Sequence, residues 1–224
     1  MAVKIMRFEL GLPLRIGKVN CYLVRSGSGY FLVDTGGANQ RAALDKELER
    51  AGCRPGNLKL IVLTHGDFDH SGNAAFLREK YGTRIAMQAG DAGMVERGDM
   101  SFNRKKGNAL LRWLVPVFSG FGKAERFRAD IWLEEGCDLG EYGFEARVLS
   151  IPGHSLGSIG ILTAEGDLFC GDLFENTKKP ALGSIMDDVE AGRGSAGRLR
   201  GLRIRRVYPG HGRPFKMEAL ITLT

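Results

Sequence analysis

Apolar and polar residues alternate in short blocks along the first part of the chain, and each block has the length of a strand or a helix. The apolar runs at 3–8, 19–24 and 30–34 predict strands, with the last two joined by a Ser-Gly-Ser-Gly turn. Residues 40–51 carry apolar side chains at positions 42, 43, 44, 48 and 51, which is the spacing of one helix face. The continuous apolar run at 58–64 is typical of a strand that is covered on both faces.

The same alternation continues to the end of the chain. It predicts helices at 74–81 and within 189–202, and strands at 84–87, 145–151, 157–163, 168–170 and 204–208. Strands and helices alternate in both halves, so we expect two β-sheets that are each covered by helices on the outer face. The predicted fold class is an α/β four-layer sandwich with the layer order α, β, β, α.

A chain of 224 residues is long enough for one domain, and no linker-like segment divides it, so we expect a single domain over 1–224. Residues 99–127 are rich in Phe, Trp and basic residues and lack a strand pattern. This composition predicts either a lid over a site or an outer helical segment. The longest apolar stretch, 109–121, is interrupted by Arg112 and Pro116 and is too short to span a membrane.

Charge and cysteine usage narrow the classes of function. The net charge is +6, but the basic clusters come without aromatic platforms or a nucleic-acid-binding motif, so a nucleic-acid partner is not predicted. Lys4, Arg7 and Glu9 interrupt the N-terminal segment where a signal peptide would need an apolar core. The four cysteines have no C-x-x-C spacing, which favours reduced thiols in a cytoplasmic protein.

The candidate chemistry is concentrated in histidines and aspartates that follow the predicted strands. The chain has four histidines, all in glycine-containing turns: His65, His70, His154 and His211. Three aspartates accompany them: Asp67, Asp69 and Asp172. Loops at strand ends converge at one edge of an α/β sheet, and imidazole with carboxylate groups is a donor set for divalent metal ions. The seven residues together therefore predict a site with enough donors for two ions.

Taken singly, each of these motifs has a simpler interpretation. A Gly-His turn is commonly a hydrogen-bonding or capping residue, and the run Asp-x-Asp-His at 67–70 is commonly a loop with helix-capping carboxylates. Asp172 alone would be an ordinary turn residue. It is the combination of all the motifs, with no histidine elsewhere in the chain, that favours a metal site.

With these motifs the sequence resembles the metallo-β-lactamase-fold hydrolases, the superfamily of glyoxalase II, lactonases and RNase Z. The resemblance runs from Asp34-Thr-Gly-Gly to Pro-Gly-His211-Gly and covers nearly the whole chain. It implies an αββα sandwich of two mixed sheets with the metal ions at one edge between them. It also implies the ligands: His65 and His154 for the first metal, Asp69, His70 and His211 for the second, Asp172 as a bridge, and Asp34 as a residue that orients a histidine ligand.

One position departs from the family motif His-x-His-x-Asp-His, because Asp67 stands where the second histidine belongs. A carboxylate is shorter, harder and negatively charged, so it changes the first site. Three interpretations are open. Asp67 binds the ion directly and favours Mn²⁺ or Fe²⁺ or a mixed pair, it reaches the ion through a water molecule, or the first site is weak and the protein is mainly mononuclear.

Two divalent ions, zinc first with Mn²⁺ or Fe²⁺ as alternatives, can share a water and generate hydroxide at neutral pH. Asp69 would orient this nucleophile and handle its proton. We therefore expect a small-molecule hydrolase acting on an ester, thioester or lactone bond, with a phosphodiester less favoured. The alternatives are an iron oxidoreductase, either flavodiiron-like because Asp67 is acidic or of the persulfide dioxygenase type, and a binding module with a vestigial metal site. No sequence feature indicates the oligomeric state.

Overall fold

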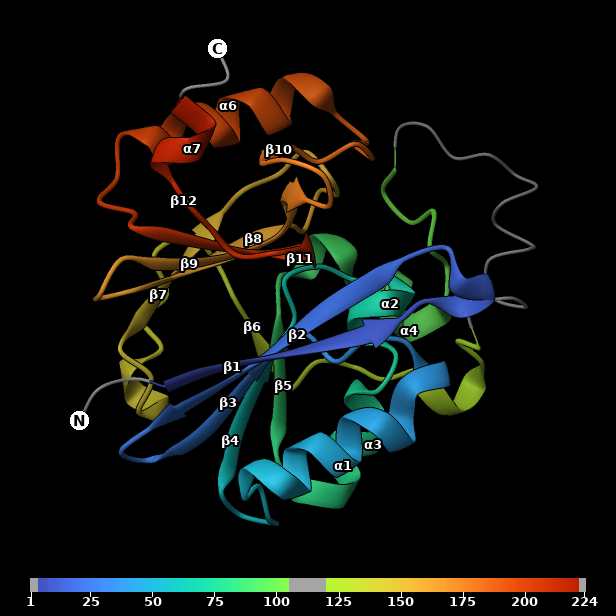
Figure 1. Cartoon of the computed structure of the whole chain (residues 1–224). Helices are drawn as coiled ribbons and strands as arrows, with labels where there is room; N and C mark the ends of the chain where they lie inside the picture. Colours follow the sequence, from blue (N-terminus) through green and yellow to red (C-terminus); the bar gives the residue numbers. More distant parts are fainter. Residues whose placement is uncertain (1–3, 105–119, 222–224) are drawn as a thin grey trace.

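The computed structural model describes residues 4–104 and 120–221, in which two β-sheets pack face to face between helices (Figure 1). The first sheet has the order β1 (Lys4–Gly11), β2 (Lys18–Ser26), β3 (Gly29–Val33), β4 (Leu58–Val62), β5 (Arg84–Met87) and β6 (Ile131–Trp132). The second has the order β12 (Phe215–Lys216), β11 (Arg206–Gly212), β9 (Asp167–Asn176), β8 (Ile159–Thr163) and β7 (Ala146–Ser150), with β10 (Ala181–Leu182) paired to β9.

Both sheets are mixed. In the first sheet β1, β2 and β3 are antiparallel, and β3, β4, β5 and β6 are parallel. The predicted hairpin is confirmed, because β2 pairs with β3 in a register that places Tyr22 opposite Val33. In the second sheet the β9–β11 pair is parallel, while β7–β8, β8–β9 and β11–β12 are antiparallel.

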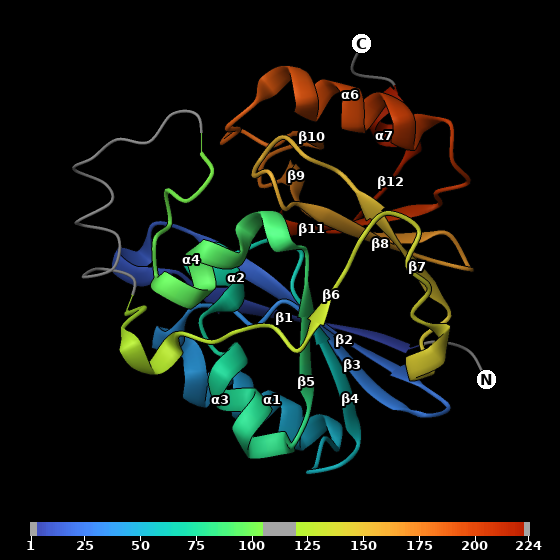
Figure 2. The ribbon, with the colours of Figure 1, turned by 180° about the vertical axis from the view of Figure 1, so that it is seen from behind.

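Helices cover the outer faces of both sheets, so the predicted four-layer α/β sandwich is confirmed (Figures 1 and 2). The helices are α1 (Arg41–Ala51), α2 (Phe68–Ser71), α3 (Ala74–Tyr81), α4 (Ala92–Arg97), α6 (Val189–Arg200) and α7 (Glu218–Ile221). Short 3-10 helices lie at Pro13–Arg15, Ala38–Gln40, Ala89–Asp91, Lys123–Glu125 and Gly140–Tyr142. None of the helices in the described ranges has the length and apolar character that crossing a lipid bilayer requires.

The period-2 pattern of the strands explains the layers. In β3, Leu32 packs toward the helices α1 and α3, while its neighbours Phe31 and Val33 pack into the space between the sheets. In β4, Ile61 and Leu60 divide in the same way. Successive side chains of a strand point to opposite faces, so a fully apolar run fills two interfaces at once.

The two strands that carry Asp172 and His211 are longer than the sequence predicts. β9 continues past the predicted end at residue 170 and includes Asp172, and β11 continues past residue 208 and includes His211. The prediction that these two residues lie in turns after their strands is therefore wrong. The pairing between β9 and β11 has register shifts on both sides of Pro209. The sequence there is polar and contains glycine, so it lacks the apolar pattern from which a strand would be predicted.

The segment 99–127 is described only in part. Residues 99–104 form turns next to α4, and residues 120–127 contain the 3-10 helix Lys123–Glu125. The remaining residues, 105–119, lie outside the described residues, so the interpretation of this segment as a lid or an outer helical layer stays a prediction. The four cysteines are free thiols, and three of them, Cys21, Cys53 and Cys170, are buried.

Candidate metal centre

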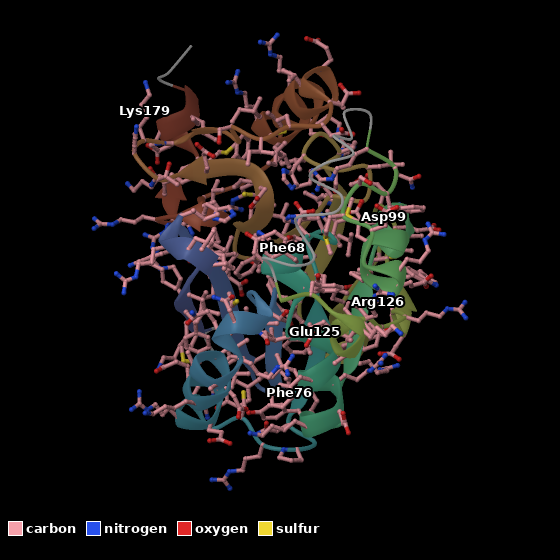
Figure 3. The ribbon with its side chains drawn as sticks, turned by 90° about the vertical axis from the view of Figure 1, so that its right-hand side faces the viewer. Phe68, Phe76, Asp99, Glu125, Arg126 and Lys179 are labelled. Atoms are coloured by element: carbon pink, nitrogen blue, oxygen red, sulfur yellow. The ribbon has the colours of Figure 1, made fainter. Side chains whose placement is uncertain are left out.

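The seven predicted site residues meet at one edge of the sandwich, between the two sheets. His65 follows β4, Asp67 immediately precedes α2, and Asp69 and His70 lie within α2. From the second sheet come His154 in the loop after β7, Asp172 in β9 and His211 in β11. Figure 3 shows the molecule from the right-hand side of Figure 1, with Phe68, the first residue of α2, near the middle of the view. Residues far apart in the sequence thus reach a common centre.

The imidazole rings form a continuous row. The ring centroids of His154 and His65 are 4.6 Å apart, those of His65 and His70 are 4.0 Å apart, and those of His70 and His211 are 5.5 Å apart. Two groups of donor atoms follow from this row: His65, His154 and Asp172 form one, and Asp69, His70 and His211 form the other. Within each group the donor atoms lie within 4.8 Å of one another.

Asp172 lies between the two groups. Its Oδ1 is 3.4 Å from His70 Nε2, and its Oδ2 is 3.2 Å from His211 Nε2. Asp69 Oδ2 is 3.5 Å from His211 Nε2 and 3.8 Å from His70 Nε2. Nitrogen and oxygen donors at about 2.0–2.2 Å from one tetrahedral ion are separated by about 3.3–3.6 Å, so this spacing suits coordination of a single cation.

Every histidine of the row is anchored through Nδ1, which leaves Nε2 facing the centre. The anchors are Thr64 Oγ1 for His65 (3.0 Å), Asp34 Oδ2 for His70 (2.9 Å), the Ile185 carbonyl for His154 (2.8 Å) and the Lys18 carbonyl for His211 (2.7 Å). An acceptor at Nδ1 places the proton there and leaves the Nε2 lone pair for a ligand. The implied contact of Asp34 with a histidine is present, because Asp34 accepts a hydrogen bond from His70 Nδ1. Asp34 also accepts a hydrogen bond from the Thr64 hydroxyl at 2.8 Å, and the same hydroxyl oxygen contacts His65 Nδ1, so Asp34 supports His65 indirectly.

Three buried atoms of the centre test whether a cation fits. Among the described residues, His65 Nε2, His70 Nε2 and Asp172 Oδ1 are buried and have no hydrogen-bond partner. A buried polar group left unpaired costs about 1–3 kcal/mol, which a bound cation would remove. Gly210 lies against the same point, and a Cβ there would collide with Asp172 and His70. The residues present therefore fit divalent metal ions.

The electrostatics of the metal-free centre show how strongly its groups interact. Burial opposes ionisation of Asp172, but His70 and His211 outweigh it and hold the pKa of this carboxyl well below its usual range. Burial raises the pKa of Asp69, with Asp172 adding to the effect. Burial also disfavours the charged form of His211, but Asp172 prevails and raises the pKa of His211 to about 9. In the metal-free centre these shifts favour a charged His211 beside an ionised Asp172.

Asp67 lies beside the first group. Its Oδ2 is 2.9 Å from His154 Nε2 and 3.7 Å from His65 Nε2, and its Oδ1 accepts a hydrogen bond from Arg104 at 2.5 Å. Its side chain makes no capping hydrogen bond to α2, so the helix-capping interpretation is wrong for this residue. The choice among direct ligation, ligation through water and a weak first site is open to experiment.

Sequence reasoning missed one residue that shapes the centre. Asp91 is fully buried, and its carboxylate accepts hydrogen bonds from Gly66 N at 3.0 Å, Ser155 Oγ at 2.6 Å and Gly157 N at 2.8 Å. It ties the loop of His65 to the loop of His154. The sequence carries a signal for it, because Gly90-Asp91 follows the predicted strand 84–87 just as the other Gly/Asp motifs follow theirs.

A pocket of about 750 Å³ opens onto the centre. Its lining contains Leu12, Pro13, Leu14, Ile16, Gly17, Lys18, Asp67, Phe68, Asp69, His154, Asp172, Glu175, Thr177, Gly183, Ser184, Ile185 and His211. The three most exposed large apolar side chains of the described residues all belong to it: Leu14 at 77%, Ile16 at 72% and Ile185 at 70%. The pocket thus joins the candidate metal centre to an apolar rim.

Comparison with known proteins gives the family. The model of the metallo-beta-lactamase superfamily matches residues 14–211, so the chain belongs to this superfamily. The hydroxyacylglutathione hydrolase GloC of Haemophilus influenzae is 29% identical over 173 residues, which cover 75% of this chain and 72% of that protein. A hydroxyacylglutathione hydrolase of Pelagibacter ubique is 28% identical over 140 residues, which cover 58% of this chain and 46% of that protein. The chain therefore spans less than half of the second relative.

A solved structure has the same fold. The protein TTHA1623, crystallised in a di-iron-bound form, superposes with a TM-score of 0.71 and is 28% identical, with 94% of this chain and 96% of that chain covered. Family, fold and the two His/Asp groups together define a member of a metallo-hydrolase superfamily with a candidate dinuclear metal site.

Proposed function

We propose that this protein is a metal-dependent hydrolase that cleaves an ester, thioester or lactone bond of a small molecule in the cytoplasm. One observation carries the proposal: four Nδ1-anchored histidines direct Nε2 toward carboxylates at the floor of a pocket. The identity to hydroxyacylglutathione hydrolases supports the same class of reaction. The ligands that we propose are His65, His154 and Asp172 for one ion, and Asp69, His70, His211 and Asp172 for the other.

When bound, the metal ions supply a water of lowered pKa and polarise the carbonyl that is attacked. The protein supplies position and proton transfer. Asp69 lines the pocket beside His70 and His211, so its carboxylate lies where it can accept a proton from the attacking water and release it to the leaving group. Asp34 and Thr64 hold the imidazoles in place throughout.

The pocket supports an apolar substrate group. Leu14, Ile16 and Ile185 present apolar surface to solvent at its rim, and burial of such surface contributes about 25 cal/mol per Å² to binding. Among the described lining residues Lys18 is the only lysine or arginine, and its Nζ already pairs with Glu9 at 2.5 Å. We therefore infer that an acyl or leaving group with alkyl or aryl character binds here, rather than a polyanionic one.

The test begins with the metal content of protein purified without chelator. The protein is then loaded with Zn²⁺, Mn²⁺ or Fe²⁺ and assayed against aryl esters, thioesters and lactones. The expected result is a colourless zinc or manganese protein with esterase, thioesterase or lactonase activity. Asp172→Asn should lose metal and activity, whereas the control Asp167→Asn, in the same strand but paired with Arg205, should keep both. A fully loaded protein inactive on the whole panel would refute the proposal.

One observation favours a second candidate, an iron oxidoreductase. Asp67 offers a hard oxygen donor beside the first group, and the similar protein TTHA1623 binds two irons. A coloured protein that retains two irons per chain, turns over a reductant with dioxygen and leaves all esters intact would select this alternative.

A further inference from the structure

Both carboxylate oxygens of Asp67 are engaged by named partners. Oδ1 accepts a hydrogen bond from Arg104 Nη2 at 2.5 Å, and Oδ2 lies 2.9 Å from His154 Nε2. The Arg104 and Asp67 side chains are only 15% and 18% exposed, so the ion pair is largely shielded from water. A shielded ion pair is screened little by solvent and salt, so each member strongly affects the other.

The two contacts of Asp67 lie on different oxygens. His154 uses Nδ1 toward the Ile185 carbonyl, so Nε2, which lies 2.9 Å from Asp67 Oδ2, is the ring atom left for a cation, and a cation bound there would face Oδ2. Arg104 contacts the other oxygen, Oδ1, so it can stay paired with Asp67 when a cation is bound.

Arg104 is held in place by its own segment. The preceding residue, Asn103, donates its side-chain amide to the Gly90 carbonyl at 2.8 Å, and Arg97 lies over the ring of Phe102 at 4.6 Å. Arg104 Nη2 donates to Asp67, whereas Arg104 Nε is buried and has no hydrogen-bond partner among the described residues. Removing Asp67 would leave a shielded positive charge next to the first metal group.

We propose that Arg104 is a positioning residue of the first metal site, which holds Asp67 and offsets its charge so that the Asp67–Arg104 pair takes the place of one neutral histidine. The inference rests on the proposed metal-dependent function. The motif that the sequence resembles has a histidine at position 67, which carries no charge when it binds a metal. An aspartate alone would add one negative charge to the site, and the arginine restores the balance.

The alternative is that the pair merely tethers the segment 99–104 to the body of the protein. If the pair has only this structural role, substitutions at Asp67 and Arg104 should change only the stability of the metal-free protein. Charge compensation predicts something that a tether does not: restoring the family motif with Asp67→His alone should damage the first site, because Arg104 then repels the incoming cation without a counter-charge.

The experiment measures bound Zn²⁺ per chain, with affinity from competition against a chromogenic chelator. Asp67→His should weaken the first-site ion by about tenfold or more, since two like charges a few ångströms apart repel by more than 1.4 kcal/mol at an effective dielectric constant of 20. Asp67→His/Arg104→Met removes the charge but keeps an aliphatic stem, and should recover two ions per chain. Asp67→His/Arg104→Lys keeps the charge and should stay deficient.

The matched control is Asp67→His/Arg97→Met, which removes a neighbouring arginine that stacks on Phe102 instead of pairing with Asp67, and should stay deficient. Circular dichroism and the melting temperature of each metal-free variant identify any that fail to fold, and Arg104→Gln then replaces Arg104→Met. Equal first-site affinity in Asp67→His and Asp67→His/Arg104→Met would overturn the inference. Wild-type protein that binds two ions but hydrolyses nothing would refute the proposed function and leave this comparison intact.

Discussion

Asp34 offers the sharpest test of how the centre is held together, because one buried carboxylate orients two histidines. It is 2% exposed, and it accepts hydrogen bonds from Thr64 N (2.8 Å), Thr64 Oγ1 (2.8 Å) and His70 Nδ1 (2.9 Å). Its backbone is left-handed, with φ +59°. Asp34→Ala removes all three acceptor contacts and places an alanine in a conformation that disfavours it.

The expected magnitude follows from these contacts. The Thr64 amide and His70 Nδ1 would each be left buried and unpaired, at about 1–3 kcal/mol per group, whereas the Thr64 hydroxyl can rotate to another partner. The left-handed backbone costs alanine about 1–2 kcal/mol, but aspartate already bears part of this cost, so the substitution adds less than about 1 kcal/mol. A loss of about 2–7 kcal/mol is expected, which is a large fraction of a total stability of about 5–15 kcal/mol.

Two further variants separate the contributions. Asp34→Gly removes the same contacts without the backbone strain and should exceed Asp34→Ala in stability by about 1–2 kcal/mol. Asp34→Asn tolerates the left-handed backbone and retains one acceptor oxygen, so it should be the most stable of the three. Urea denaturation of the metal-free proteins gives the free energies of unfolding, and chelator competition should show a loss of about 10–100-fold in metal affinity.

The reasoning is refuted by specific results. A destabilisation by Asp34→Ala of less than about 1 kcal/mol would mean that its three contacts contribute little to folding. Unchanged metal affinity in a folded Asp34→Gly, which keeps no acceptor for His70 Nδ1, would mean that the anchoring of His70 Nδ1 does not orient the ligand.

Three other expectations concern proton release, the pocket rim and loop packing. Because Asp172 outweighs burial and raises the pKa of His211 to about 9 from 6.5, this ring stabilises the metal-free protein fully below pH 6.5, and the contribution disappears as pH rises through about 9. Zn²⁺ must displace the proton of His211 when it binds. Calorimetry in buffers of different ionisation enthalpy should therefore show proton release on Zn²⁺ binding at pH 7.5 and a smaller release at pH 10. Equal proton release at the two pH values would contradict this expectation. Ile185→Ser should raise KM severalfold for a hexanoyl ester relative to an acetyl ester, whereas Val189→Ser, outside the pocket, should not; the same KM ratio in both variants would exclude the apolar rim from binding. Gly153 has φ +149°, and a Cβ there would point at the backbone of Gly192 in α6, so Gly153→Ala should lower the free energy of unfolding by about 1–3 kcal/mol in thermal denaturation. Gly194 also lies in α6 but faces open space, so Gly194→Ala should not destabilise the protein. Similar melting temperatures for the two variants would argue against this packing.

The layers of the fold are readable from the sequence because strands encode two faces at once. The run that contains Leu60 and Ile61 is apolar except for the exposed Lys59, since one residue faces the other sheet and the next faces the helices. β9 and β11 are harder to predict from sequence at the positions where Asp172 and His211 replace apolar residues. A strand that carries polar site residues at a register shift has no period-2 pattern to recognise.

Some residues of the candidate site can be predicted from local sequence motifs, whereas others depend on tertiary packing. His65, Asp69 and His70 belong to one short motif, so a single stretch of sequence predicts them together. The pairing of Asp67 with Arg104 spans 37 positions and depends on how the segment after α4 packs, which no local pattern encodes. The exposure of Ile185 beside the centre likewise results from tertiary packing alone.

The carbonyl anchors of His154 and His211 have a consequence for loop engineering. Ile185 lies in the loop between β10 and α6, and Lys18 is the first residue of β2, directly after the loop that carries Leu14 and Ile16. Both stretches of backbone also line the pocket, so each one orients a candidate metal ligand and shapes the substrate site. Exposed side chains of the loop before β2, such as Leu14 and Ile16, can be varied in a mutant library without touching these anchors. Insertions or deletions next to Lys18 would reorient the His211 imidazole as well as reshape the pocket. Loops exchanged here to change substrate specificity must therefore keep their length.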